Sequence, residues 1–314
     1  MNSIYNNYKK LISDEDAYKF LDKYLNVPSL LRLKRISYFC GMDYASKDIY
    51  DFKEKLTRFD HSLTVALLTW RFTHDKSQTL AGLFHDIATP CFSHVIDYMN
   101  KDYKSQESTE EKTSEIILKD KLLRHYLEKD NIDINAVIDF KSYSIVDNNR
   151  PMLCADRLDG IILTGLGWTK RIDNNDVIKI INSLDIFLNE DEKLEIGFND
   201  RDTALLTLNK SNEIDEYCHS NEDNFMMELL ADITRNAIIE KIIDYDDLYY
   251  LNENIVFDLI KKYGSDNLLN KMYIFENIKK ENIPLIKLEN VKVRDLNPLV
   301  NGKRLLSYMY KRKI

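Results

Sequence analysis

Two histidines and two aspartates stand in an order that suits a bound metal ion. His61 lies in the segment RFDHS, and Asp156 lies in CADRLDG. Between them, His85 and Asp86 are adjacent in LFHDIATP. Imidazole and carboxylate groups are ligands for borderline or hard divalent ions such as Mn, Fe, Zn or Mg. Such an ion activates water at neutral pH, so the chemistry that this set predicts is hydrolysis.

The adjacent pair sets a condition on the elements that carry it. Consecutive residues of a helix point about 100° apart, so His85 and Asp86 reach one ion only where that ion lies in a groove between neighbouring helices. His61 and Asp156 must then come from those neighbours. A helical bundle with an internal metal site is therefore the economical arrangement.

Each of these residues has an ordinary explanation when it is taken singly. A histidine beside an apolar run, such as His61, is commonly a core or surface residue, and an acid such as Asp156 is commonly a surface charge. The signal is the ordered set: a histidine, an HD pair whose histidine follows 24 residues later, and an aspartate 70 residues after that pair. We therefore treat the combination, and not any one member, as the metal-site prediction.

Residues that break secondary structure are sparse, which favours a mainly α fold. The 314 residues include five prolines and eight glycines. Helical spacing of apolar residues predicts helices over 62–72, 77–87, 110–126, 132–140, 155–166, 176–188, 224–243 and 252–264. Polar stretches predict loops over 101–109 and 189–202, and alternating apolar residues predict short strands over 273–278 and 283–293. This change of character places a boundary near residue 245, before a smaller mixed α/β part.

Charge and composition restrict the class of protein. The net charge of −8 argues against general binding of duplex nucleic acid, which needs a basic surface. The sequence has no apolar run long enough to cross a membrane and no signal-peptide centre in its first ten residues, so we expect a cytoplasmic protein without a membrane partner. Its four cysteines are too widely spaced for a zinc knuckle and are expected to be free thiols.

The flanks of these motifs identify a family resemblance. RFDHSLTVA, AGLFHDIATPCFSHVIDY and CADRLDGI resemble the HD-domain superfamily of metal-dependent phosphohydrolases, and within it the branch of the dNTP triphosphohydrolases. The resemblance covers about residues 30–165 and continues weakly to about 260. It implies an HD-domain helical bundle over 1–245, with a C-terminal accessory region over 246–314 packed on it. Assembly into a homo-oligomer is open by the same analogy.

The resemblance also assigns roles to single residues. It places the divalent metal on His61, His85, Asp86 and Asp156, the four residues that we call the His–Asp cluster. Arg58 matches an arginine that contacts substrate phosphate, and we expect it to take part in catalysis together with Asp86. Arg157 stands where the branch has a basic phosphate contact, and Asp159 matches a further acidic residue of the same helix. We therefore expect Arg157 and Asp159 to contact substrate.

Several positions depart from the pattern of the triphosphohydrolases. Thr89 replaces the second histidine of HDxxH, and Glu110, or Glu111 with a small shift of the alignment, replaces a later histidine that helps proton transfer. Glu110 is then the expected acid or base. Gly160 and Thr164 replace a tyrosine and an arginine that hold substrate.

His94, in CFSH, matches a histidine common in the branch. We interpret it as a structural bridge from the metal helix to its neighbour in preference to a catalytic residue.

Three hypotheses follow. The first is a metal-dependent phosphohydrolase that acts on a nucleotide or a related phosphate substrate. The second is a regulatory module that binds a nucleotide or a metal without turnover, because the residues around the His–Asp cluster have changed. The third and weakest is a phosphodiesterase that acts on nucleic acid. Only the basic stretch 303–313 supports it.

Overall fold

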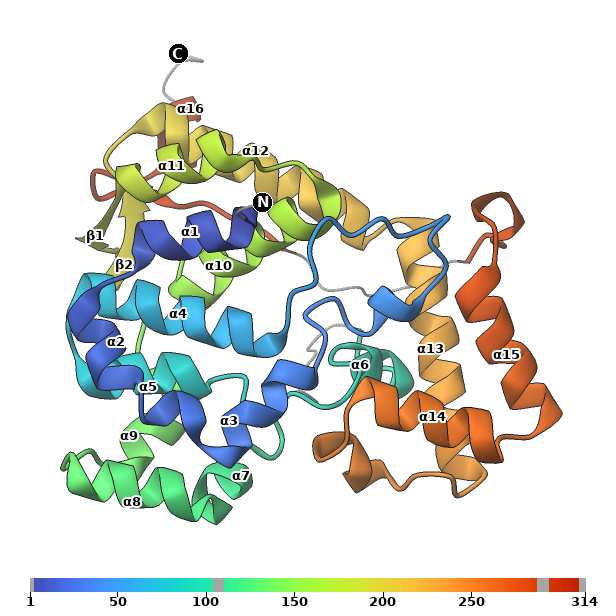
Figure 1. Cartoon of the computed structure of the whole chain (residues 1–314). Coiled ribbons are helices and arrows are strands. Elements are labelled where there is room, and N and C mark those ends of the chain that lie inside the picture. Colours follow the sequence, from blue (N-terminus) through green and yellow to red (C-terminus); the bar gives the residue numbers. More distant parts are fainter. Residues whose placement is uncertain (1–2, 104–109, 287–293, 311–314) are drawn as a thin grey trace.

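The computed structural model describes residues 3–103, 110–286 and 294–310, and its described part is mainly α-helical (Figure 1). The α-helices are α1 (Ile4–Ile12), α2 (Glu15–Leu21), α3 (Pro28–Arg32), α4 (Arg58–Thr73), α5 (Lys76–Phe84), α6 (Val95–Met99), α7 (Thr113–Lys119), α8 (Lys121–Lys129), α9 (Ile134–Ile138), α10 (Ala155–Thr164), α11 (Asn174–Ser183), α12 (Arg201–Cys218), α13 (Asn221–Ile239), α14 (Glu253–Tyr263), α15 (Asp266–Asn277) and α16 (Leu305–Tyr310). Within these ranges, none of the helices combines the length and the apolar character needed to cross a membrane.

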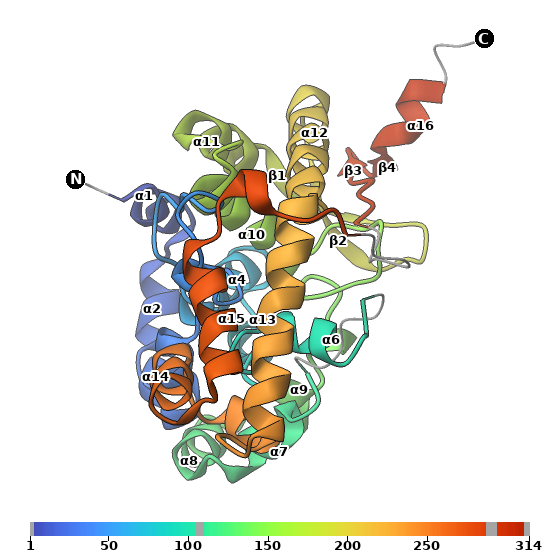
Figure 2. The same ribbon diagram turned by 90° about the vertical axis from the view of Figure 1, so that its right-hand side faces the viewer.

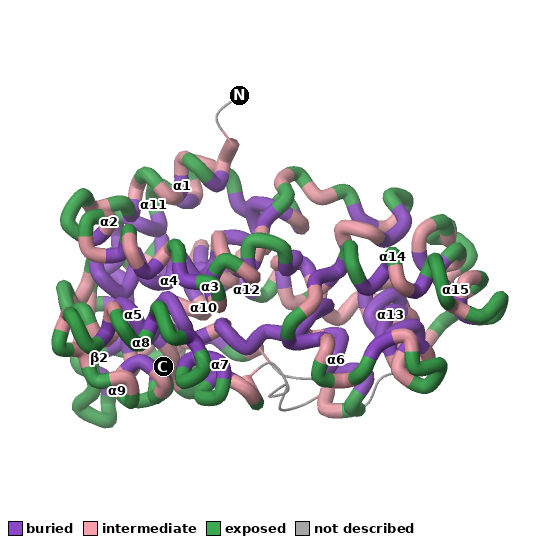
Figure 3. The backbone as a smooth tube through the Cα atoms, turned by 60° about the horizontal axis from the view of Figure 1, so that its bottom comes forward, coloured by how far each residue is buried: buried purple, intermediate pink, exposed green. Residues whose placement is uncertain are grey.

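Helix α4 lies at the centre of the fold. Helix α4 packs against α5, α10 and α1. It begins with a capping box, in which the Thr57 hydroxyl accepts from the Asp60 backbone N–H and the Asp60 carboxylate accepts from the Thr57 backbone N–H. Figure 3 shows buried backbone along α4 and α10 and exposed stretches on outer helices such as α2. The start of α4 is therefore fixed both by its cap and by burial.

Two hydrophobic clusters make up the core. The larger one joins α1–α5 with α10 and α11. The second joins residues 42–50 and α6 with α13, α14 and α15. Figure 2 shows α13 and α15 side by side, and these two helices are in contact. Apolar packing thus connects residues on both sides of position 245, while the division of the chain at that position stays a prediction.

A small sheet joins the C-terminal residues to the middle of the chain. Strands β1 (Leu184–Leu188) and β2 (Leu194–Phe198) pair antiparallel, β3 (Leu299–Val300) pairs parallel with β2, and β4 (Lys303–Arg304) pairs antiparallel with β3. The small mixed α/β part is therefore confirmed, but its strands are not the predicted ones.

The differences from the sequence prediction have local causes. The helix expected over 176–188 ends at Ser183, because the next five residues pair with β2. The loop expected over 189–202 contains β2, and α12 was not expected. The strand expected over 273–278 was wrong, since Ser265 caps α15 and the helix continues to Asn277.

Other expected segments were divided or lie partly outside the described residues. The helix expected over 110–126 is α7 followed by α8, divided where the Asp120 carboxylate accepts the N–H groups of Leu122 and Leu123. Residues 283–286 form no strand. The rest of this expected strand, 287–293, lies outside the described residues. So do residues 104–109 of the loop expected over 101–109, and residues 311–313 of the basic stretch.

A buried ion pair connects this sheet to the segment before α10. Glu195 on β2 is fully buried, and Arg304 donates to both of its carboxylate oxygens at 2.6 and 2.8 Å. The same carboxylate accepts the backbone N–H of Leu153 at 3.1 Å. The backbone N–H of Asn297 also donates to the Pro151 carbonyl. The C-terminal residues thus hold the segment that leads into Asp156.

Removing the arginine from this pair should destabilise the fold. Arg304→Met leaves the Glu195 carboxylate buried without its cation, so we expect the free energy of unfolding to fall by about 3–5 kcal/mol. Urea denaturation followed by circular dichroism measures the change. Lys303→Met, at the exposed neighbouring position, is the control and should change it by less than about 0.5 kcal/mol. Equal effects of the two substitutions would contradict the role of the pair.

Candidate metal centre

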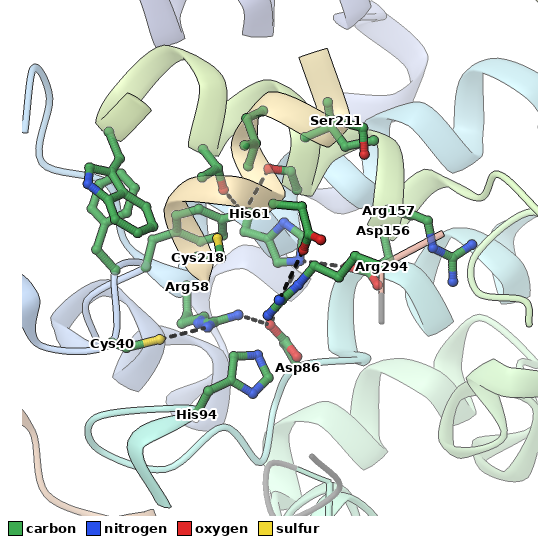
Figure 4. Close-up of a pocket in the computed structure, with 18 of the residues that line it drawn as sticks. Cys40, Arg58, His61, Asp86, His94, Asp156, Arg157, Ser211, Cys218 and Arg294 are labelled. Atoms are coloured by element: carbon green, nitrogen blue, oxygen red, sulfur yellow. Dashed lines mark hydrogen bonds and ion pairs between the residues drawn. The ribbon is translucent and has the colours of Figure 1, made fainter. Parts of the chain in front are cut away.

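The His–Asp cluster comes together from three helices. His61 lies in the first turn of α4, His85 and Asp86 directly follow α5, and Asp156 lies in the first turn of α10. Figure 4 shows His61, Asp86 and Asp156 converging at the wall of a cavity. The structure therefore brings the four predicted ligands together, between neighbouring helices as the sequence indicated.

The distances within the cluster suit a single ion. Nε2 of His61 lies 3.0 Å from Oδ1 of Asp156 and 3.8 Å from Oδ2 of Asp86. Nε2 of His85 lies 3.5 Å from Oδ1 of Asp156 and 3.8 Å from Oδ1 of Asp86. Ligand atoms that each lie about 2.1 Å from one ion are about 3–4 Å apart. The ligand atoms of His61, His85 and Asp86 all lie within 4.8 Å of one another, as around a single ion, and Asp156 adds contacts to both histidines.

Hydrogen bonds behind the two histidines direct their Nε2 atoms into the cluster. Nδ1 of His61 donates to the Asp159 carboxylate at 2.7 Å, and Nδ1 of His85 donates to the Gly82 carbonyl at 2.8 Å. Metal-binding histidines usually donate their other ring N–H in this way. Among the described residues, nothing hydrogen-bonds to the buried Nε2 of His85. An ion in the cluster would satisfy this nitrogen.

The electrostatics of the cluster favour a positive charge at its centre. Burial alone would lower the pKa of His61, but hydrogen bonds to Asp156 and Asp159 raise the pKa to about 10. Burial would raise the pKa of Asp86, but the charges of His85 and Arg58 lower it to about 2. The carboxylates therefore stay ionised, and a divalent cation fits between them.

Arg58 lies beside the cluster, as the sequence predicted. Its side chain is buried and lines the cavity. Nη1 donates to Asp86 at 3.0 Å, and Nε donates to the Ser93 hydroxyl at 3.2 Å. Figure 4 shows its guanidinium between Cys40 and Asp86. Nη2 donates to the Cys40 sulfur at 4.0 Å, so protein groups hold all three nitrogens of the guanidinium.

Asp159 and Arg157 differ in how well they fit the predicted contact with substrate. Asp159 is fully buried behind His61, accepts from the Tyr8 hydroxyl at 2.6 Å and does not line the cavity, so a substrate contact does not fit its position. Arg157 does line the cavity, but its guanidinium donates to the Asn148 side chain and to the backbone carbonyls of Asn148 and Met152. Its hydrogen bonds hold the segment before Asp156.

The positions that depart from the family pattern are also placed. Glu110 lines the cavity in an ion pair with Lys141 at 2.6 Å, whereas Glu111 accepts from the Tyr249 hydroxyl. Gly160 leaves space that the hydroxyl of Tyr38 approaches, 3.4 Å from the Gly160 carbonyl. A tyrosine from an upstream segment therefore stands beside the helix position where the triphosphohydrolases, which the sequence resembles, carry a tyrosine. The motifs gave no signal for this replacement.

His94 lies closer to the chemistry than the sequence interpretation suggested. It lines the cavity, and its Nδ1 donates to the fully buried carboxylate of Asp97 at 2.9 Å. Figure 4 shows the imidazole beside Asp86 and Arg58. Such a carboxylate–imidazole pair fixes the ring and leaves Nε2 for a proton transfer.

The cavity extends well beyond the His–Asp cluster. Its volume is about 500 Å³, which is in the range of pockets that hold an entire small organic molecule. Lining residues that sequence reasoning missed come from loops and from the C-terminal half: Tyr50, Asp147, Arg150, Trp168, Asp223 and Arg294.

Comparison with known proteins agrees with this site. Residues 58–159, which include the whole His–Asp cluster, match the HD domain. A stretch of 134 residues is 30% identical to the metal-dependent phosphohydrolase cns2 of Cordyceps militaris and covers 42% of this chain and 38% of that protein. A stretch of 108 residues is 28% identical to the uncharacterized protein YdhJ of Bacillus subtilis, covering 34% and 33%.

These matches span 33% of the length of YdhJ and 38% of the length of cns2. They support the HD superfamily and a general link to metal-dependent phosphohydrolases, without confirming the triphosphohydrolase branch. Together with the cluster of His61, His85 and Asp86, they indicate a divalent metal as the cofactor.

Metal analysis tests the ligand set. We expect the purified protein to retain a divalent metal, and His85→Ala and Asp86→Ala to lose most of it because each removes a ligand atom. A chelator should lower the melting temperature of the wild type and added Mn²⁺ should restore it, since a ligand of the folded state stabilises that state. His125→Ala, an exposed histidine on α8, is the matched control. Unchanged metal content in both cluster variants would exclude this ligand set.

Proposed function

We propose that this chain is a metal-dependent phosphohydrolase that cleaves a phosphate ester or anhydride of a small molecule, with nucleotides as the substrate class. The observation that carries the proposal is the placement of Arg58 beside the His–Asp cluster, on the wall of one cavity. The partial similarity to a protein named a metal-dependent phosphohydrolase supports the same reaction class.

The residues divide the work of hydrolysis between them. A divalent ion, when held by the His–Asp cluster, supplies a water of lowered pKa and shields phosphate charge. Arg58 orients a phosphate oxygen through the N–H groups of Nη1 and Nη2 that Asp86 and Cys40 leave free. Because its guanidinium is already held in place, little freedom is lost when substrate binds.

Proton transfer to the leaving oxygen falls to His94 in this proposal. Its imidazole lines the cavity, and the Asp97 carboxylate orients the ring by accepting from Nδ1. Glu110, the acid or base expected from the sequence, is the alternative, since it lines the same cavity while bound to Lys141. A positioned acid of this kind contributes about 10²–10⁴-fold to the rate.

Two residues act through others in this proposal. Asp159 is a positioning residue, because its carboxylate fixes the ring of His61 and the tautomer in which Nε2 is free. Arg157 positions the segment before Asp156 through its bonds to Asn148 and Met152. Neither needs to touch substrate to affect the reaction.

Hydrolysis by the purified protein tests the reaction class. With Mn²⁺ or Mg²⁺ we expect release of phosphate, pyrophosphate or triphosphate from at least one nucleotide of a broad panel. His85→Ala and Asp86→Ala should remove this activity, while His125→Ala should keep it. Activity that survives both cluster substitutions would refute the mechanism. Nucleotide-dependent thermal stabilisation without any product would instead support a binding module.

The identity of the proton donor is tested by two matched amide substitutions. His94→Gln should lower kcat about 100-fold or more, because it removes the acid and keeps a polar side chain of similar length. Glu110→Gln should have a much smaller effect. Both variants should retain the metal, which separates proton transfer from metal loss. The reverse ranking of kcat values would assign the role to Glu110.

A further inference from the structure

The cavity has a second wall that the proposed reaction does not use. Beyond the His–Asp cluster it is lined by three aromatic rings, Tyr50, Phe52 and Trp168, together with Met227 and the carboxyl group of Asp223. The rings of Tyr50 and Phe52 are stacked, with centroids 5.4 Å apart and an interplanar angle of 8°. This wall combines flat apolar faces with one buried acid.

A π-helical turn places Trp168 in this wall. Residues Gly165–Thr169 form the turn, a conformation that is frequent at functional sites. A Cβ atom at Gly167 would lie 2.6 Å from the ring of Phe39, so the backbone can approach only with glycine there. The Trp168 ring consequently lies 5.7 Å from the ring of Tyr50, tilted by 45°.

Asp223 is the polar group of this wall. It lies in the first turn of α13 and is only 8% exposed. Its Oδ1 accepts from the Tyr50 hydroxyl at 2.6 Å, and no other donor to its side chain is found among the described residues. Burial raises the pKa of Asp223 to about 7. A carboxyl group in such a place is stabilised when a ligand donates further hydrogen bonds to it.

The simplest alternative is that Asp223 only anchors Tyr50 in the core. Two observations argue against it. Tyr50, Trp168 and Asp223 also line a second cavity of about 290 Å³, so open space lies on two sides of this wall. The nearby cation Arg294 contacts Asp215 at 3.3 Å and Nε2 of His219 at 3.4 Å, and in the described part of the chain no hydrogen bond joins it to Asp223.

The chemistry of the wall matches a flat ring that carries N–H groups. Bases stack on aromatic side chains with about 1–3 kcal/mol per base. Aspartate and glutamate accept hydrogen bonds from base amino groups. A sugar would offer hydroxyl donors to the carboxylate but no flat π face to the rings, whereas a hydrocarbon would leave the carboxylate without a donor.

Resting on the proposed function, we propose that Asp223 and the partly exposed ring of Trp168, both held by the buried Tyr50, form the recognition site for the base of a nucleoside phosphate, with Asp223 accepting an N–H of that base while the phosphate lies at Arg58. Asp223 is thus a specificity-determining residue for the organic part of the substrate. It takes no part in the bond cleavage.

Binding of nucleosides without phosphate tests this site independently of hydrolysis. Calorimetry with adenosine, guanosine, cytidine and uridine should show that at least one of them binds the wild type, and that Asp223→Asn and Asp223→Ala each weaken this binding about 10–100-fold. Glu228→Gln is the matched control, because Glu228 also lies on α13 and accepts from a tyrosine, Tyr103, outside the cavity. It should bind like the wild type.

A second variant keeps the test valid if Asp223→Ala fails to fold. Tyr50→Phe retains the ring and removes the one donor to Asp223, so it should preserve or tighten nucleoside binding. In hydrolysis, Asp223→Asn should raise KM for the preferred nucleoside phosphate about tenfold or more and change kcat little. KM for ribose 5-phosphate, which has no base, should not change.

The outcomes separate this proposal from the proposed function. Nucleoside binding that depends on Asp223, without hydrolysis of any phosphate, would overturn only the phosphohydrolase. Hydrolysis of ribose 5-phosphate with no nucleoside binding, or nucleoside binding that is unchanged in Asp223→Asn, would overturn the base site.

Discussion

The fold depends on a constraint at its centre: two imidazole nitrogens must point at the same place as two carboxylates. A histidine ring is free to rotate, so each ring is fixed from behind, His61 by Asp159 on α10 and His85 by a carbonyl of its own helix. The hydrogen bond between His61 and Asp159 crosses from α4 to α10 inside the larger hydrophobic cluster. Because this hydrogen bond forms only when α4 and α10 pack closely, the packing of the two helices also sets the direction of the His61 ligand atom.

The sequence was informative where the chemistry is local. The His–Asp cluster and Arg58 lie in short motifs whose order and spacing can be recognised from the sequence alone. The structure brings these five residues together. The roles of other residues depend on partners far along the chain. Tyr38 meets Gly160 across 122 positions, and Tyr50 meets Asp223 across 173. No periodicity encodes such contacts, so these residues could not be found.

The secondary structure was likewise predicted where it depends on local sequence and missed where it depends on contacts with distant residues. Helices with long apolar stripes, such as α4 and α13, were predicted because the spacing of their apolar residues indicates which face is buried. The strands were not, since Leu184–Leu188 is apolar enough to extend the preceding helix and becomes a strand only by pairing with β2. Conversely, the alternating residues 273–278 lie mostly in α15, where the cap at Ser265 and packing on α13 decide the conformation. Tertiary contacts outweighed local preference in both cases.

The link from Arg304 through Glu195 to Leu153 has a consequence for protein synthesis. The segment that leads into Asp156 is held by residues made some 140 positions later, at Asn297 and Arg304. While a ribosome is still translating the middle of the chain, three of the four ligands can already meet, but the fourth lacks its support. A nascent chain would thus acquire its finished pocket only after Asn297 and Arg304 have been made.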